Sequence, residues 1–248
     1  MHVFFVLSMD FIGDVKYNVL RRGLMSVEKP YYQETLRFWK DLKEEQKTLL
    51  NQSIIKKHFN KGEAMRTSSD NCSGLFLIET GQVRAYIVSE NGKEITLYRL
   101  FERDLCIFSA SCIMRNISFD IFIETEKDTE AYLIPTPIFD KLSKESMAVQ
   151  AFTNELMASR FSEVMWIMEQ ALFMTLDKRL AIFLIDQSNI DESDSIEITH
   201  ERIANHLGSA REVVSRMLKY FQDEGMVSLS RGLVHITDRK KLEELTMY

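Results

Sequence analysis

The fold is decided by residues 198–237, ITHERIANHLGSAREVVSRMLKYFQDEGMVSLSRGLVHIT. The spacing of apolar residues predicts a first helix over about 200–207, which Gly208 ends because glycine readily adopts the left-handed conformation of a helix C-terminus. Ser209 is placed to cap a second helix, and Gly225 ends it. Two helices joined by a tight turn that contains glycine predict a helix-turn-helix.

The buried faces of both helices are predicted by apolar residues at helical spacing. These residues are Ile203, Ala204 and Leu207 in the first helix and Val214, Met217, Leu218 and Phe221 in the second. Thr199 precedes the first helix as a typical N-cap residue. After Gly225, apolar and polar residues alternate about Arg231-Gly232, which predicts a small β-hairpin wing.

Another face of the second helix carries Arg211, Glu212, Ser215 and Arg216. In a helix-turn-helix bound to DNA, the N-terminal residues of the second helix meet base edges, where arginine donates to guanine and glutamate accepts from cytosine. Each residue also has an ordinary alternative, such as a solvated charge or, for Glu212, a capping box with Ser209. We interpret the four together as base-reading residues, because they occur inside a helix-turn-helix followed by a wing.

Phosphate contacts are expected from Thr199, Ser209 and Lys219, which fix the register on DNA without reading its sequence. The net charge of the chain is −6, but residues 196–248 carry eight basic and eight acidic side chains. The whole net charge of −6 therefore lies in residues 1–195, and the C-terminal part repels a polyanion least.

Upstream, short runs rich in valine, isoleucine and aromatic residues predict β-strands. Residues 74–100, GLFLIETGQVRAYIVSENGKEITLYRL, predict three strands with hairpins at Gly81 and at Asn91-Gly92, the latter as a type I′ turn. Residues 117–139 add two more strands. Strands at this spacing predict a barrel or jelly-roll sandwich.

Helices flank these strands. Residues 34–57 predict one or two helices, and residues 175–187 predict another. Residues 139–172 contain no glycine or proline and predict one long helix. We expect it to bury its apolar stripe on a second copy in a parallel two-helix dimer seam, although packing across its own barrel is the alternative.

This order of elements resembles the Crp/Fnr family of bacterial transcription regulators over about residues 30–245. The resemblance implies an α+β fold and a homodimer. It assigns an N-terminal β-roll (double-stranded jelly roll) sensor domain with its N-terminal helices to 25–138, a dimerisation helix to 139–172 and a winged helix-turn-helix to 173–248. Residues 1–24 fit no element well, and we interpret them as a misassigned start or a disordered extension, with Met25 as the expected start.

The motif E-x-x-S-R, from Glu212 through Ser215 to Arg216, is similar to the Fnr-like branch of the family. It implies a palindromic promoter site with half-sites resembling TTGAT, and RNA polymerase as a partner. The Crp-like branch has glycine where Ser215 stands, and Arg211 matches a basic position of that branch.

The expected sensor ligands of the family find little support in the sequence. The arginine and serine that hold the phosphate of cyclic AMP fall at Phe119 and Asp120, and the ribose-binding glutamate falls near Ser109, so we predict no cyclic AMP binding. An iron–sulfur cluster needs four thiolates, but the chain has three cysteines. A haem ligand would have to be His58, for which a surface role is favoured.

Cys106 and Cys112, spaced C-x5-C, are the remaining unusual chemistry of the sensor domain. The ordinary interpretation is that they are small buried apolar residues. The alternatives are a redox-active thiol pair and a pocket for a small-molecule effector beside Trp166.

No arrangement of nucleophile and base, no phosphate-binding glycine loop and no metal-spaced cluster occurs, so the sequence does not favour an enzyme. No run approaches the length of a membrane span, and unpaired cysteines suit a reducing cytoplasm. The rival interpretation is a small-ligand-binding or scaffolding module whose helix-turn-helix does not bind DNA.

Overall fold

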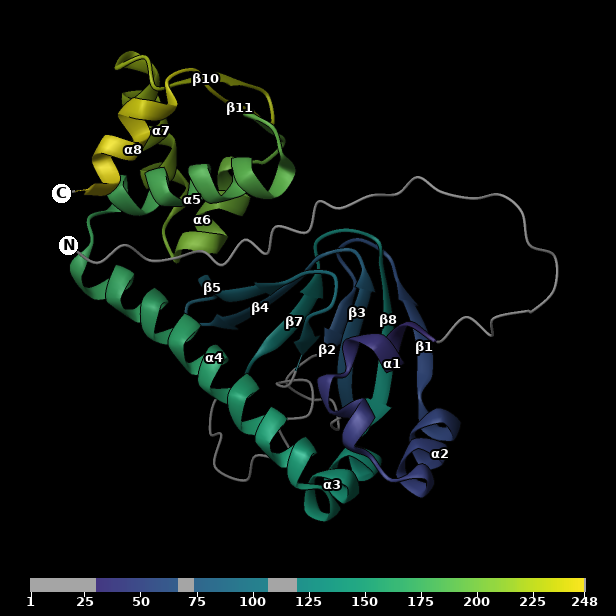
Figure 1. The fold of residues 1–248 in the computed structure, drawn as a ribbon. Coiled ribbons are helices and arrows are strands. Elements are labelled where there is room, and N and C mark those ends of the chain that lie inside the picture. The colour runs from purple at the N-terminus through teal and green to yellow at the C-terminus, as the bar shows by residue number, and fades with distance from the viewer. Residues whose placement is uncertain (1–29, 67–73, 107–119, 248) are drawn as a thin grey trace, which may run out of the picture.

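The computed structural model describes residues 30–66, 74–106 and 120–247. Two sheets form a β-roll, with short helices at one end and the long helix α4 running along its side (Figure 1). The helix-turn-helix domain lies at the C-terminal end of α4. The predicted α+β architecture is therefore confirmed. The expectations for residues 1–24, Met25, Ser109, Cys112 and Phe119 lie outside the described residues.

The β-roll consists of two four-stranded antiparallel sheets, ordered β1-β8-β3-β6 and β2-β7-β4-β5. Its strands are β1 (Ile55–Phe59), β2 (Ala64–Arg66), β3 (Gly74–Thr80), β4 (Val83–Val88), β5 (Glu94–Leu100), β6 (Leu105–Cys106), β7 (Phe122–Thr125) and β8 (Thr129–Pro135). The three strands predicted over 74–100 and the two predicted over 117–139 are confirmed.

The two predicted hairpins of this region differ in outcome. β3 and β4 belong to different sheets, so the turn at Gly81 crosses between sheets and the hairpin prediction there is wrong. Gly81 has φ +103°, and a Cβ at this position would lie 2.4 Å from Oγ1 of Thr129. The β4–β5 hairpin is confirmed, but only Gly92 in its loop has a positive φ, so the turn is not type I′.

The N-terminal helices are shorter than predicted. They are α1 (Tyr31–Thr35), the 3-10 helix η1 (Arg37–Asp41) and α2 (Glu44–Ser53). Residues 55–57, which the sequence placed in a helix, belong to β1, because Ile55 pairs with Leu133 of β8. Leu36, Phe38 and Leu50 are buried and close one end of the β-roll core.

The single helix predicted over 139–172 is two helices, α3 (Thr136–Glu145) and α4 (Met147–Phe173). Ser146 separates them with an extended backbone, and its side chain caps α4 by accepting a hydrogen bond from the amide of Val149. Phe139 and Leu142 of α3 are buried in the β-roll core and are not available to a dimer seam.

The C-terminal domain is a winged helix-turn-helix, as predicted. Its elements are α5 (Leu176–Asp191), β9 (Ser195–Ile196), α6 (His200–Leu207), α7 (Arg211–Asp223), β10 (Val227–Ser230), β11 (Leu233–Ile236) and α8 (Arg239–Met247). β10 and β11 form the predicted wing, while β9, which pairs with β11, and α8 were not predicted. Ile203, Val214 and Phe221 are buried in one core with α5, and Met217 is partly buried against it.

Local signals at the helix ends account for this accuracy. Thr199 accepts a hydrogen bond from the amide of Arg202, and Gly208 ends α6 with φ +65°. Gly225, with φ +71°, ends α7, where the amide of Met226 bonds to the carbonyl of Phe221. The prediction that Ser209 caps α7 is wrong, because Ala210 is the N-cap residue and no side chain bonds there. Glu212 is therefore not half of a capping box.

No helix in the described ranges is long and apolar enough to cross a membrane.

Candidate nucleic-acid interface

The first two turns of α7 bring the four predicted base-reading residues together. Arg211, Glu212 and Arg216 are exposed, and Ser215 beside them is half-buried. Val214 and Leu218 on the opposite face are fully buried in the domain core. The helix is thus held by its apolar face and presents a polar face with two arginines and one glutamate.

Ser215 is already engaged inside the domain. Its Oγ lies 2.9 Å from Nδ1 of His200, the first residue of α6. Burial and the nearby charge of Arg211 lower the pKa of His200, which favours the neutral imidazole. His200 was not singled out from the sequence, because only the packing of α6 against α7 brings it to Ser215.

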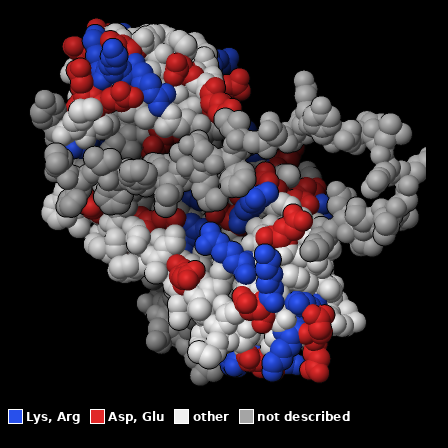
Figure 2. All heavy atoms as spheres, in the orientation of Figure 1, with Lys and Arg blue, Asp and Glu red and all other residues white. Residues whose placement is uncertain are grey.

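The three predicted phosphate-binding residues occupy different surroundings. Thr199 is exposed at the start of α6, and Ser209 is half-buried in the turn. Lys219 is exposed and forms an ion pair with Asp223, with 2.9 Å between Nζ and Oδ1. Figure 2 shows basic and acidic side chains interspersed on the visible face of the helix-turn-helix domain. This agrees with the balanced charge of the C-terminal part and gives no continuous basic field on that face.

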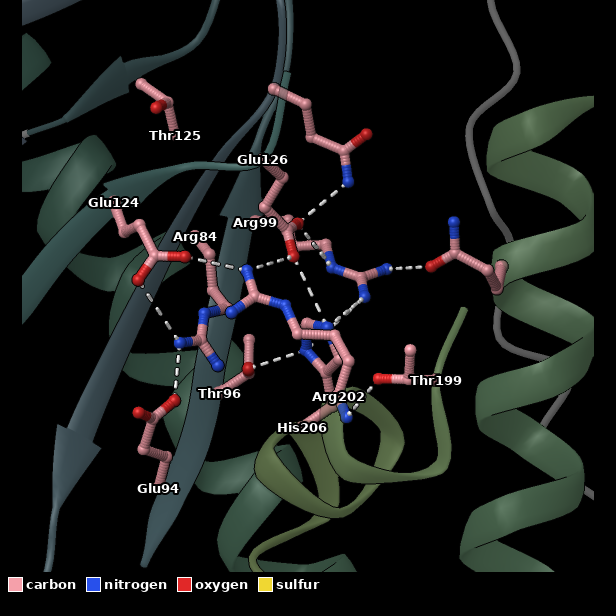
Figure 3. Close-up of polar contacts among 12 residues, drawn as sticks. Arg84, Glu94, Thr96, Arg99, Glu124, Thr125, Glu126, Thr199, Arg202 and His206 are labelled. Carbon is pink, nitrogen blue, oxygen red and sulfur yellow. Dashed lines mark hydrogen bonds and ion pairs between the residues drawn. The ribbon is translucent and has the colours of Figure 1, made fainter. Parts of the chain in front are cut away.

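A second polar arrangement joins the helix-turn-helix domain to the β-roll (Figure 3). We call it the interdomain cluster. Its members are Arg84, Arg99, Glu124, Glu126, Arg202 and His206. From α6, a guanidinium nitrogen of Arg202 lies 2.9 Å from Glu124 and 3.2 Å from Glu126. The ring Nε2 of His206 lies 3.3 Å from Glu126.

On the β-roll side, Arg99 of β5 lies 3.1 Å from Glu126 and donates a 2.8 Å hydrogen bond to Gln187 of α5. Arg84 of β4 is fully buried, stacks 3.9 Å from the ring of Tyr86, and lies 3.7 Å from Glu124. Two carboxylates thus face guanidinium groups from both domains.

The protonation states follow from this geometry. Burial lowers the pKa of His206 to about 4, and the charge of Arg99 adds to that effect. Nδ1 of the neutral ring lies 2.8 Å from the hydroxyl of Thr96 and accepts from it, while Nε2–H faces Glu126. Burial alone would raise the pKa of Glu126, but the hydrogen bond from His206 and the charge of Arg99 outweigh it and hold the pKa well below its usual range.

Backbone and apolar contacts accompany the charges. Ile95 of β5 forms an isolated antiparallel bridge with Leu207 of α6. Gly208 follows, and a Cβ there would lie 3.2 Å from Cδ1 of Ile95. This contact was not predicted from the sequence. The signal that was available is the pair of arginines, Arg84 and Arg99, inside otherwise apolar strand patterns.

Of the three predicted effector residues, Cys106 and Trp166 are described by the structure, and Cys112 lies outside the described residues. Cys106 is buried in the β-roll core beside Tyr98, where burial first and Cys106 second raise the pKa of the Tyr98 hydroxyl. Trp166 on α4 is 40% exposed. His58 lies at the surface, 2.7 Å from Glu130. Within the ranges that the structure describes, no three His, Cys, Asp or Glu side chains gather as a metal site.

Comparison with known proteins gives the family. The model of the Crp-like helix-turn-helix domain matches residues 178–245, and that of the cyclic nucleotide-binding domain matches residues 56–146. A solved structure of a Crp/Fnr family transcriptional regulator from Eubacterium rectale is 50% identical, with a TM-score of 0.85, and the match covers 87% of this chain and 100% of that one.

Two named relatives lie in the same family. The anaerobic regulatory protein of Haemophilus influenzae is 29% identical over 77% of this chain and 76% of its own length. The fumarate and nitrate reduction regulatory protein of Vibrio cholerae is also 29% identical, over 77% of this chain and 78% of its own length. The chain belongs to the Crp/Fnr family of transcriptional regulators, whose members bind DNA, act as dimers and are not enzymes.

Proposed function

We propose that this regulator is a homodimer that reads a palindromic promoter site with α7. The observation that carries the proposal is the polar face formed by Arg211, Glu212 and Arg216, which are exposed while Val214 and Leu218 are fully buried. A helix fixed by one face presents the other to the major groove.

Half-sites resembling TTGAT are proposed from Glu212, Ser215 and Arg216, which match the Fnr-like pattern. Arg216 would donate two hydrogen bonds to guanine, and Glu212 would accept from a cytosine amino group. Arg211 would add a further base contact at the start of the helix. Thr199, Ser209 and Lys219 would contact phosphates and fix the register.

Dimerisation is proposed through α4. Of its 27 residues, only Val149, Arg160 and Gln170 are buried in the single chain. Four apolar side chains recur at steps of four, three and four residues and are exposed: Phe161 (67%), Met165 (37%), Met168 (46%) and Leu172 (65%). This is the spacing of a two-helix seam, and a second copy of α4 would cover the stripe.

The signal is proposed to act on the β-roll, and the bound dimer to contact RNA polymerase. Cyclic AMP and haem are not the expected effectors because of the residues at Phe119, Asp120 and His58, and an iron–sulfur cluster is not expected because the chain has three cysteines. The candidates for the effector or redox site remain Cys106, Cys112 and Trp166. The match to the cyclic nucleotide-binding domain supports the fold of this part of the chain rather than its ligand.

Selection of bound duplexes from a random pool tests the proposal, because it yields the half-site and the spacing together. Arg216→Ala should weaken binding to the selected site by about 1–3 kcal/mol and relax one base position. Lys219→Ala is the matched control: it should weaken binding to all duplexes alike and reduce the salt slope by about 1. A parent protein that selects no consensus and does not bind duplex DNA would instead support the ligand-binding or scaffolding alternative.

A further inference from the structure

The orientation of α7 depends on where α6 is held. α6 and α7 share one hydrophobic core, in which Ile203, Leu218 and Phe221 are buried, so the two helices move as one body. α5 packs in the same core and is connected to α4 through Met174 and Thr175, both with extended backbones. A two-residue extended link does not by itself fix an angle, so a noncovalent contact must do so.

The interdomain cluster is that contact, and Glu126 is its common acceptor. Glu126 lies in the turn between β7 and β8, where its amide bonds to the carbonyl of Gln82 at 2.7 Å. Its carboxylate receives Gln82 at 2.9 Å and Arg99 at 3.1 Å from the β-roll. The same carboxylate receives Arg202 at 3.2 Å and His206 at 3.3 Å from α6.

The interdomain cluster contacts the helix-turn-helix domain through α6 and leaves the polar face of α7 uncovered. Arg211, Glu212 and Arg216 remain exposed while α6 lies against β5. The side chains of Glu126 and Arg99 are each 11% exposed, so removal of one partner would leave a largely buried charge uncompensated, which favours one geometry of the contact over neighbouring ones.

We propose that Glu126 is a positioning residue for DNA reading. It fixes α7 at one angle relative to the apolar stripe of α4 and so sets the half-site spacing that the dimer accepts. This inference rests on the proposed function, since it assumes that α7 reads DNA. After one α7 of the dimer has bound its half-site, binding of the second α7 depends on its effective concentration at the other half-site. A loosened angle spreads α7 over many positions and lowers the effective concentration at the matching one.

The test uses the full-length protein and duplexes that carry two selected half-sites at a series of spacings, together with a duplex that carries a single half-site. The parent should bind one spacing best. Glu126→Gln removes the charge and keeps the size of the side chain. It should lower the advantage of the best spacing over its neighbours by about tenfold or more, which is about 1.4 kcal/mol. Affinity for the single half-site and the preferred bases should not change.

Two further variants make the result specific. Arg202→Met removes a partner on the α6 side and should flatten the spacing profile in the same way, which keeps the test open if Glu126→Gln fails to fold. Glu130→Gln is the matched control, because the ion pairs that Glu130 forms among the described residues, with His58 and Lys56, lie within the β-roll. Its spacing profile should equal that of the parent.

Outcomes separate this inference from the proposed function. A folded Glu126→Gln protein with the spacing profile of the parent overturns the positioning role, even when half-site preference is normal. A variant that binds the best spacing more tightly than the parent also overturns it, because the contact would then oppose DNA binding. If the parent protein shows no half-site preference, both the proposed function and the positioning role of Glu126 are overturned.

Discussion

Acidification should weaken the folded state through His206. The pKa of this residue falls from its usual value near 6.5 to about 4 in the folded protein. Unfolding therefore takes up a proton between these two pH values, and the stabilisation is complete above 6.5 and lost as the pH falls towards 4. A shift of this size corresponds to about 3 kcal/mol, of which about 2 kcal/mol is lost between pH 7 and pH 5.

The measurement compares the parent with His206→Gln, whose amide can still face Thr96 and Glu126 but does not titrate. Urea unfolding followed by circular dichroism at several pH values gives the free energy of unfolding of each protein. The stability difference between the two should shrink by about 2 kcal/mol from pH 7 to pH 5. Asn205→Gln, on the same helix, changes no titrating group and should follow the parent. If the profiles of the parent and His206→Gln run parallel, the surroundings of His206 do not hold it neutral in the folded protein.

Three further predictions concern other parts of the chain. Phe161→Glu and Leu172→Glu should each convert the dimer to a monomer in sedimentation, because a charge would enter the proposed seam, whereas the exposed Glu155→Gln should leave it intact. Phe221→Ala should lower the free energy of unfolding by about 3–5 kcal/mol, since the ring is fully buried; a loss under 1 kcal/mol in urea unfolding would contradict this. Gly208→Ala should lower the free energy of unfolding by at least about 1 kcal/mol in the same assay, because φ is +65° and the added Cβ meets Ile95. Gly208→Asn adds the same Cβ but adopts a positive φ more readily than alanine, so it should lower the free energy of unfolding less.

The helix-turn-helix was predictable because its determinants are local. Gly208 and Gly225 take positive φ where the sequence placed the helix ends, and the buried positions follow one helical period. Errors arose where the local signal was ambiguous. The apolar pattern over 139–172 continues without a break, but Ser146 ends α3 and caps α4. Ser209 is a typical capping residue, but Ala210 occupies the N-cap position of α7.

The interdomain cluster was not predictable, because its members come together only in the tertiary structure. Arg202 and Glu124 are 78 positions apart, and Arg99 and His206 are 107 apart. Single-sequence patterns carry no record of such pairs. The available signal was Arg84 in the apolar strand sequence VRAYIV. A charged side chain that is buried in a strand needs a partner from another element.

The length of α4 determines how far a small tilt of this helix displaces the helix-turn-helix domain at its C-terminal end. At 1.5 Å per residue, its 27 residues form a rod of about 40 Å that starts at Ser146. A tilt of about 5° at that end displaces the other end by about 3.5 Å, which matches the rise of about 3.4 Å from one base pair to the next. A change of a few degrees in the direction of α4 would therefore move the helix-turn-helix domain at its far end by about the distance between neighbouring base pairs.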